Sequence, residues 1–266
     1  MSLLEALILG IIQGVTEFLP VSSSGHLQIG AAILGIQSSE NLLFTIIVHG
    51  ATVLSTTIVF WKEIILIGKG VLKFKLNEET KLVLYIIISM IPVGIIGIFF
   101  ESQLEAFFDG QIVFVASMLM LTGFLLLATN FLKAKNASGT LSYTKASIIG
   151  IAQAIAVLPG ISRSGATIAT GLILGVDKEK ATRFSFLMVI PPILGATLLK
   201  VKELIEAPTL HSQISNAALI VGFIAALTFG IIACRWMISI VKKGSLVYFA
   251  YYCFAISAIT LITQFI

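Results

Sequence analysis

Six apolar segments of about 20 residues each dominate this sequence. A helix of that length crosses the roughly 30 Å hydrocarbon core of a bilayer, because each helical residue rises about 1.5 Å. Hydrophobic residues make up 58% of the chain and charged residues 11%, whereas soluble domains average about 25% charged residues. The sequence therefore predicts an all-α integral membrane protein. The predicted spans are residues 41–60, 84–103, 111–131, 184–200, 215–240 and 245–266.

Two further apolar segments, residues 3–36 and 146–176, are each interrupted by a polar stretch. The interruptions read LPVSSSGH at residues 19–26 and PGISRSG at residues 159–165. The halves on either side are too short to cross a bilayer alone. Non-helical backbone is tolerated at membrane depth only where protein buries it or where it lines a wet cavity. We therefore expect each segment to form a re-entrant hairpin of two half-helices that returns to the same side of the membrane.

The two halves of the sequence resemble each other at a fixed offset of 140 residues. The matched pairs include Gly10 and Gly150, Gln13 and Gln153, Ser22 and Ser162, Ser24 and Ser164, Gly25 and Gly165, Phe44 and Phe184, and Lys62 and Lys202. Each copy holds one re-entrant hairpin and three spans, and an odd number of crossings gives the copies opposite orientations. The sequence thus predicts one membrane domain, residues 1–266, built from two inverted-topology repeats at about 1–131 and 141–266.

Positive charge is distributed unevenly over this predicted topology. Fourteen Lys and Arg residues fall on one face, and only Lys200 and Lys202 fall on the other. Cytoplasmic loops carry the excess of Lys and Arg, so the basic face is predicted to be cytoplasmic. The first hairpin then opens to the outside while the second rises from the cytoplasm, so that their polar tips can meet. The net charge of +4 is explained in the same way, and no nucleic-acid partner is predicted.

This topology places one acidic residue, Glu17, and one basic residue, Arg163, at membrane depth. An ionised side chain is costly there, which makes each of them a candidate functional residue by default. Gln13 lies four residues before Glu17 and shares its face of the first half-helix. The planar guanidinium of Arg163 suits phosphate oxygens, which it can bind with two parallel hydrogen bonds. A structural alternative, in which Arg163 pairs with Glu17 and locks the two hairpins, stays open.

Serines stand where each second half-helix begins. Ser and Thr are good helix N-caps, so capping alone could explain some of them. A helix start also offers free N–H groups and a partial positive charge, which bind phosphate. Two such starts converging with an arginine predict a cradle for more than one phosphoryl group. The candidate binding residues are Gln13, Ser22, Ser24, Gly25, Ser162, Ser164, Gly165 and Thr167.

Two histidines lie in the predicted membrane segments. His26 follows the first serine run, where the helix N-terminus disfavours the protonated ring and leaves a neutral imidazole that can accept a proton. His26 is therefore a candidate base beside Glu17 and Ser23. For His49, in the middle of the span 41–60, we favour the role of a hydrogen-bonding core residue.

Two long motifs also resemble those of a known family. QGVTEFLPVSSSGH at residues 13–26 and PGISRSGAT at residues 159–167 are similar to the two signature motifs of the bacitracin-resistance type undecaprenyl-diphosphate phosphatases. The resemblance extends over essentially the whole chain. It implies a hydrolase of the bacterial inner membrane, with its active site facing the periplasm, that removes one phosphate from undecaprenyl diphosphate. The product is the lipid carrier recycled for peptidoglycan synthesis, and the activity confers resistance to bacitracin.

The resemblance also implies site residues and a cofactor. The (E/Q)xxxE motif of the family falls on Gln13 and Glu17, so that an amide here replaces the variable first acid. The other motif residues fall on Ser22, Ser23, Ser24, His26, Ser162, Arg163, Ser164 and Thr167. The family depends on a divalent cation, Mg²⁺ or Ca²⁺, which we expect Glu17 to bind together with the substrate oxygens.

Residues and resemblance together predict a mechanism. Arg163 and the half-helix N–H groups are expected to hold the phosphates and the charge that develops on them. Ser23 is the preferred nucleophile, with His26 or Glu17 as the base and a phosphoserine intermediate; direct attack by an activated water is the alternative. A carrier that flips polyprenyl phosphate is the rival function, because transporters also use inverted repeats with broken helices. The oligomeric state stays open, with a homodimer among the arrangements that the sequence allows.

Overall fold

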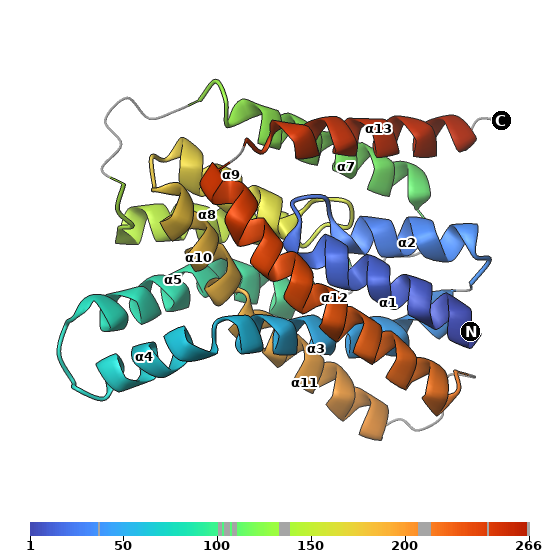
Figure 1. The fold of residues 1–266 in the computed structure, drawn as a ribbon, viewed down its shortest axis with the longest axis horizontal. Coiled ribbons are helices and arrows are strands. Elements are labelled where there is room, and N and C mark those ends of the chain that lie inside the picture. Colours follow the sequence, from blue (N-terminus) through green and yellow to red (C-terminus); the bar gives the residue numbers. More distant parts are fainter. Residues whose placement is uncertain are drawn as a thin grey trace.

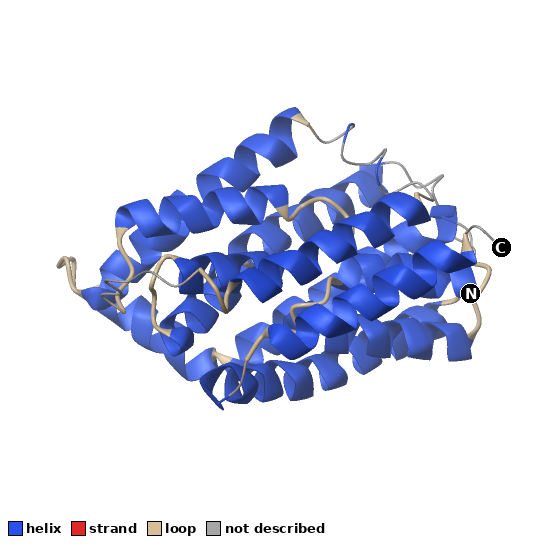
Figure 2. Ribbon diagram, turned by 90° about the horizontal axis from the view of Figure 1, so that it is seen from above, coloured by secondary structure: helices blue, strands red, loops and turns tan. Residues whose placement is uncertain are grey.

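The chain is helical throughout the part that the structure describes. The computed structural model describes residues 1–36, 38–100, 103, 107, 111–132, 139–206, 214–243 and 245–264. Apart from one isolated β-bridge, its regular elements in those ranges are helices (Figure 2). They are α1 (Leu3–Phe18), α2 (Ser23–Ile33), α3 (Ser38–Val59), α4 (Trp61–Val71), α5 (Glu78–Phe99), α7 (Ile112–Ala128), α8 (Tyr143–Ile155), α9 (Arg163–Ile173), α10 (Lys178–Met188), α11 (Ile190–Glu206), α12 (Asn216–Lys243) and α13 (Val247–Thr263).

Both interrupted segments form the helix–turn–helix pairs that the sequence predicts. Helix α1 ends at Phe18 and packs against α2, which begins at Ser23. Helix α8 ends at Ile155 and packs against α9, which begins at Arg163. We call the intervening segments the first turn, residues 19–22, and the second turn, residues 156–162. The second turn contains Gly160 with a φ of 94°, a conformation that side chains disfavour.

The described helices fit a membrane protein in length and composition. Among the described residues, Glu78–Phe99, Lys178–Leu199 and Asn216–Val241 are each long and apolar enough to cross a bilayer. The bent pair Leu43–Val59 and Trp61–Val71 makes a fourth if it is counted as one span. The apolar helices α7 and α13 are shorter and lie side by side (Figure 1). These lengths agree with a helical membrane protein, and the number of six spans stays a prediction.

Two predicted spans differ in detail from the structure. The span predicted at 184–200 belongs to a helical stretch that starts at Lys178 and breaks at Val189, between α10 and α11. Pro191 and Pro192 follow the break, and prolines lack the N–H that would continue the helical hydrogen bonds. The span predicted at 41–60 is followed by α4, which was not predicted and lies at 72° to it.

Large apolar side chains cover much of the exterior. Ile98, Phe99 and Leu198 are exposed to 77%, 71% and 68%. A soluble surface rarely presents apolar side chains in such density, because their burial from water is strongly favourable. Lipid is the medium in which such a surface is stable, which agrees with the composition.

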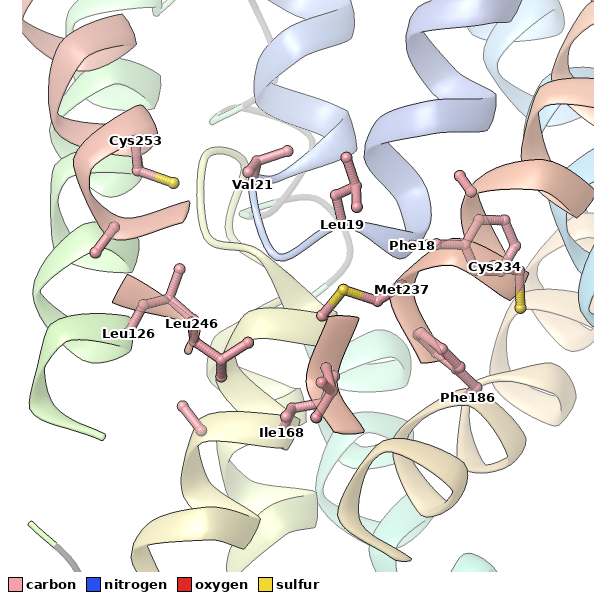
Figure 3. Packing of buried hydrophobic residues seen from close by; sticks show 14 of the residues in the cluster. Phe18, Leu19, Val21, Leu126, Ile168, Phe186, Cys234, Met237, Leu246 and Cys253 are labelled. Atoms are coloured by element: carbon pink, nitrogen blue, oxygen red, sulfur yellow. The ribbon is translucent and has the colours of Figure 1, made fainter. Parts of the chain in front are cut away.

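The largest buried apolar cluster of the described residues supports the first turn and α9. Phe18 and Leu19 from the first turn region pack in it with Ile168 of α9, Phe186 of α10 and Met237 of α12 (Figure 3). The rings of Phe18 and Phe186 meet edge to face with centroids 5.7 Å apart. The first turn therefore rests on a packed core that fixes its position relative to α9.

Helix α1 packs closely against α12 along a glycine face (Figure 1). A Cβ added to Gly10 would lie 2.5 Å from Gly222 O, and one added to Gly14 would lie 2.7 Å from Ala226 O. Both distances are too short for real contacts, and the neighbouring atoms are backbone atoms that cannot swing away. Gly10 and Gly14, four residues apart on one face of α1, therefore allow the close approach of α12.

We expect Gly10→Ala to lower the free energy of unfolding by about 1–3 kcal/mol, because the added methyl group forces α1 and α12 apart. Gly94→Ala is the matched control: no atom lies within 4 Å of its added Cβ, so helix propensity alone should leave stability unchanged or raised. Thermal unfolding in detergent can be followed with a thiol-reactive dye, since Cys234 and Cys253 are both buried. Equal melting temperatures for the two variants would contradict the packing argument.

Candidate functional site

The tips of the two hairpins meet, as the sequence predicts, because each turn contacts the first residues of the other hairpin's second half-helix (Figure 3). A Cβ added to Gly25, at the start of α2, would lie 3.3 Å from Gly160 Cα. A Cβ added to Gly165, at the start of α9, would lie 3.3 Å from Pro20 Cβ. Two helix N-termini from distant parts of the chain therefore meet at one place in the molecule.

Each of these helix starts is capped by its own serine. Ser22 Oγ accepts a hydrogen bond from Gly25 N at 3.2 Å, and Ser162 Oγ accepts one from Gly165 N at 3.0 Å. The hydroxyl groups of Ser22 and Ser162 also lie 3.3 Å from those of Ser24 and Ser164, respectively. The capping alternative therefore holds for Ser22 and Ser162.

Capping leaves backbone donors available at both helix starts. Within the described part of the chain, the first two N–H groups of α2 and of α9 donate to no acceptor. These groups belong to Ser23, Ser24, Arg163 and Ser164. Free N–H groups at a helix N-terminus form an anion site, which the positive end of the helix dipole reinforces. The two helices thus present paired donors where their turns meet.

Glu17 is the centre of a buried polar cluster. Its Oε1 accepts from the guanidinium of Arg163, and the exposed fractions of the two side chains are 6% and 22%. Its Oε2 accepts from Ser23 Oγ at 2.6 Å and from Gln13 Nε2 at 2.9 Å. His49 Nε2 lies 3.9 Å from the same oxygen. The carboxylate therefore gathers side chains from α1, α2, α3 and α9.

The ion pair between Glu17 and Arg163 joins the two hairpins, so the structural alternative weighed from the sequence is realised. A buried ion pair alone is weak grounds for stability, because desolvation offsets most of the attraction. The pair nevertheless keeps the guanidinium of Arg163, the first residue of α9, within the polar cluster around Glu17. Arg163 thus adds a charged donor to a helix start that also has free backbone donors.

His26 lies apart from this cluster. Its Nδ1 is 2.8 Å from Ser22 O, so this nitrogen carries the hydrogen. Its Nε2 is 2.9 Å from the hydroxyl of Tyr252, and the two rings stack with centroids 5.6 Å apart. Both ring nitrogens are thus engaged, and in the hydrogen bonds found among the described residues Ser23 pairs with Glu17 instead.

Thr167 packs behind the cluster. Its hydroxyl donates to Arg163 O at 2.9 Å and lies 2.6 Å from Ser185 Oγ, and the residue is 1% exposed. It therefore stabilises the first turn of α9 and joins α9 to α10. Ser164 Oγ donates to Leu19 O at 3.1 Å, which ties α9 to the first turn. Both hydroxyl groups hold the helix starts in position.

A cavity adjoins Glu17 and Arg163 on the side of the α10–α11 break. Hydroxyl groups of α3, α9 and α10 form one part of its wall, and apolar side chains form the rest. The lining residues are Glu17, Phe18, Thr52, Val53, Thr56, Arg163, Ser164, Ser185, Phe186, Val189 and Ile193. Hydroxyl-bearing and apolar side chains therefore meet beside the Glu17–Arg163 pair.

The site contains residues that sequence reasoning did not assign to it. His49 was read as a core residue, yet it faces Glu17 from α3. The available signal was an ionisable side chain in the middle of an apolar span. Tyr252 of α13 contacts His26, and no sequence signal distinguished it from other aromatic residues of that span. Ser185 was likewise hidden within a predicted span.

Comparison with known proteins places the chain in a family. Residues 6–259 match the family described as bacitracin resistance protein BacA. The chain belongs to the BacA family. This BacA protein is 55% identical over 264 residues to the undecaprenyl-diphosphatase of Bacteroides thetaiotaomicron, covering 99% of the chain and 100% of that relative. It is 54% identical over 260 residues to the undecaprenyl-diphosphatase of Bacteroides fragilis, covering 98% and 97%.

A more distant relative shows the same full-length match to this BacA protein. The undecaprenyl-diphosphatase of Methanobrevibacter smithii is 38% identical over 273 residues, covering 97% of the chain and 96% of the relative. The family assignment therefore extends over both turns and the whole polar cluster, and the resemblance read from the two motifs is confirmed.

The oxygen atoms of the cluster also fit a hard divalent cation. Gln13 is completely buried, and its Oε1 has no hydrogen-bond partner among the described residues. Carboxylate and amide oxygens are ligands that Mg²⁺ and Ca²⁺ prefer. No group of three or more His, Cys, Asp or Glu residues in the described part could hold an ion. Glu17 and Gln13 thus suit an ion that takes its other ligands from phosphate or water.

Proposed function

We propose that this BacA protein hydrolyses undecaprenyl diphosphate to undecaprenyl phosphate and inorganic phosphate, and thereby confers resistance to bacitracin. The family and the names of its close relatives support the reaction. The single observation that supports this location for the chemistry is the meeting of Glu17, Ser23 and Arg163 where two helix N-termini touch.

The diphosphate is bound by fixed donors. Arg163 and the free N–H groups at the starts of α2 and α9 surround a single region, and each kind of donor favours phosphate oxygens. Two helix starts and one guanidinium suit a ligand that carries two phosphoryl groups. The lipid chain stays in an apolar environment against the exposed apolar side chains of the helices.

Phosphoryl transfer starts at Ser23. Its hydroxyl donates to Glu17 Oε2, so Glu17 takes that proton as Ser23 Oγ attacks the terminal phosphorus. The bond from this phosphorus to the bridging oxygen breaks, and undecaprenyl phosphate leaves. Water then hydrolyses the phosphoserine, and the proton held by Glu17 returns to Ser23. Direct attack by a water that Glu17 activates is the alternative.

Glu17 is better placed than His26 to act as the base. His26 Nε2 would have to leave the Tyr252 hydroxyl before it could accept a proton from Ser23 or from water. Glu17 already accepts the hydrogen bond of Ser23 without any movement. We therefore assign Glu17 as the base and His26 as the residue that holds the first turn through Ser22 and Tyr252.

A divalent cation at Glu17 and Gln13, either Mg²⁺ or Ca²⁺, belongs to this proposal. Bound there, it would neutralise charge on the phosphate oxygens during transfer. Arg163, Ser23 and the helix N–H groups keep the roles described above.

The proposed membrane arrangement is two inverted repeats in the bacterial inner membrane, with the site open to the periplasm. The spacing of the helices along the sequence supports the two repeats, since α8 and α9 begin 140 residues after α1 and α2. Equivalent helices also make equivalent contacts: α1 packs on α12 and α8 packs on α5. The charge distribution supports the orientation. Oligomeric state, a homodimer included, is left to experiment.

Purified full-length protein in detergent is expected to release inorganic phosphate from undecaprenyl diphosphate when Mg²⁺ or Ca²⁺ is present. Detergent removes membrane sidedness, so a carrier that only flips polyprenyl phosphate would release none. Phosphate release at the level of a protein-free control would therefore refute the proposed function. The Ser23→Ala variant serves as the matched control for contaminating phosphatases.

A further inference from the structure

We propose that His49 supplies a nitrogen ligand to the divalent cation at Glu17, and that the site therefore binds transition-metal ions in preference to Ca²⁺. This inference adds a ligand to the proposed cation site, and it rests on the proposed function for the presence of the cation. Neither the family motifs nor the sequence pattern assigns His49 to the site, and the inference comes from its position on α3.

The ring of His49 turns its Nε2 toward Glu17. Its Nδ1 lies 2.8 Å from Thr45 O, a pure acceptor, so Nδ1 carries a hydrogen. In the neutral ring Nε2 is then unprotonated, and it is the nitrogen that faces Glu17 Oε2 at 3.9 Å. A metal-bound histidine usually donates its other ring N–H to a backbone carbonyl or a carboxylate, which is the arrangement seen here.

The separation of the two atoms suits a shared ion. At 3.9 Å they are too far apart for a hydrogen bond. Two ligands that each lie about 2.1 Å from one ion are separated by about 3.0 to 4.2 Å, depending on the angle at the ion. The distance between His49 Nε2 and Glu17 Oε2 falls inside that range.

Gln13 provides a third ligand from the same cluster. Its Nε2 lies 2.9 Å from Glu17 Oε2, so the amide is in contact with the carboxylate. Its Oε1 is buried and without a partner among the described residues, which costs free energy unless a cation or donor satisfies it. Carboxylate oxygen, amide oxygen and imidazole nitrogen are then three protein ligands of one ion, and phosphate oxygens and water can complete its shell.

A nitrogen ligand changes which ions the site prefers. Carboxylate and carbonyl oxygens suit Mg²⁺, Ca²⁺ and Mn²⁺, whereas imidazole increases affinity for later transition metals such as Co²⁺. His49→Gln replaces the nitrogen by an amide group of similar reach. We expect this change to lower Co²⁺ affinity about tenfold or more and to alter Ca²⁺ affinity much less.

The test uses purified full-length protein in detergent, with Mn²⁺, Co²⁺ and Ca²⁺ as probes and no substrate. Pulsed electron paramagnetic resonance of bound Mn²⁺ should show modulation from one coordinated imidazole nitrogen. That modulation should disappear in His49→Gln and persist in His26→Gln, the matched histidine control. Competition between Co²⁺ and Ca²⁺ gives the change in selectivity.

Each other outcome would overturn the inference. Wild-type protein that binds no Mn²⁺, or binds it without nitrogen modulation, contradicts the nitrogen ligand without any reliance on a variant. Modulation that persists in His49→Gln but disappears in His26→Gln assigns the ligand to His26. Phosphate release is measured separately, so loss of the proposed function and loss of the metal site can be told apart.

Discussion

Arg163→Lys is expected to lower the rate of phosphate release from undecaprenyl diphosphate by about 10²- to 10³-fold. Lysine keeps the positive charge near Glu17, so the ion pair and the fold should survive. It cannot present two parallel donors to phosphate, because an ammonium is a point charge on a flexible stem. The loss should therefore appear in turnover, with little change in melting temperature.

Arg183→Lys is the matched control for this prediction. Arg183 also forms an ion pair, with Glu63, and it is part of neither the polar cluster nor the cavity wall. Its replacement should change activity by less than about twofold, as expected for a partly exposed ion pair. Near wild-type turnover by Arg163→Lys would remove the guanidinium from the mechanism.

Ser23→Ala is expected to abolish the phosphoserine intermediate and to reduce turnover by about 10³-fold or more. The hydroxyl of Ser23 is the one that donates to Glu17, at 2.6 Å. Acid quenching during turnover of substrate labelled in the terminal phosphate should trap label on the wild-type protein. Peptide mapping should place the label on Ser23.

The neighbouring serine provides the comparison for that experiment. Ser24 contacts Ser22 Oγ, whereas Ser23 contacts the carboxylate of Glu17, so Ser24→Ala should still trap label. Substantial turnover by Ser23→Ala would instead favour a water activated by Glu17. Label that maps to His26 would overturn the assignment of the nucleophile.

The sequence was most informative where local chemistry decides the backbone. Pro20 and Pro159, with the serines and glycines that follow them, predicted where both hairpins break and where the next helices begin. The capping by Ser22 and Ser162 follows from the same local preference. Proline and serine act on their own backbone neighbourhood, so their effects can be read without knowledge of the rest of the molecule.

The sequence was less informative where helices meet. Hydropathy predicts an apolar segment but is insensitive to its direction, so the 72° bend before α4 was missed. Pro191 and Pro192, in contrast, indicate a bend in their span, which the structure has as the break at Val189. His49 and Tyr252 were missed for a related reason. Their roles depend on which face of a distant helix turns toward Glu17 or His26, and a single residue in an apolar span contains no information about that neighbour.

Backbone amides, rather than side chains, provide much of the proposed phosphate cradle at the starts of α2 and α9. No substitution except proline removes an amide hydrogen. Mutation can therefore change the lipid preference of this protein or its rate of phosphate release while anion binding persists. Inactive variants would then remain competent to sequester their substrate, and co-expressed with the wild-type protein they would compete with it for the carrier lipid.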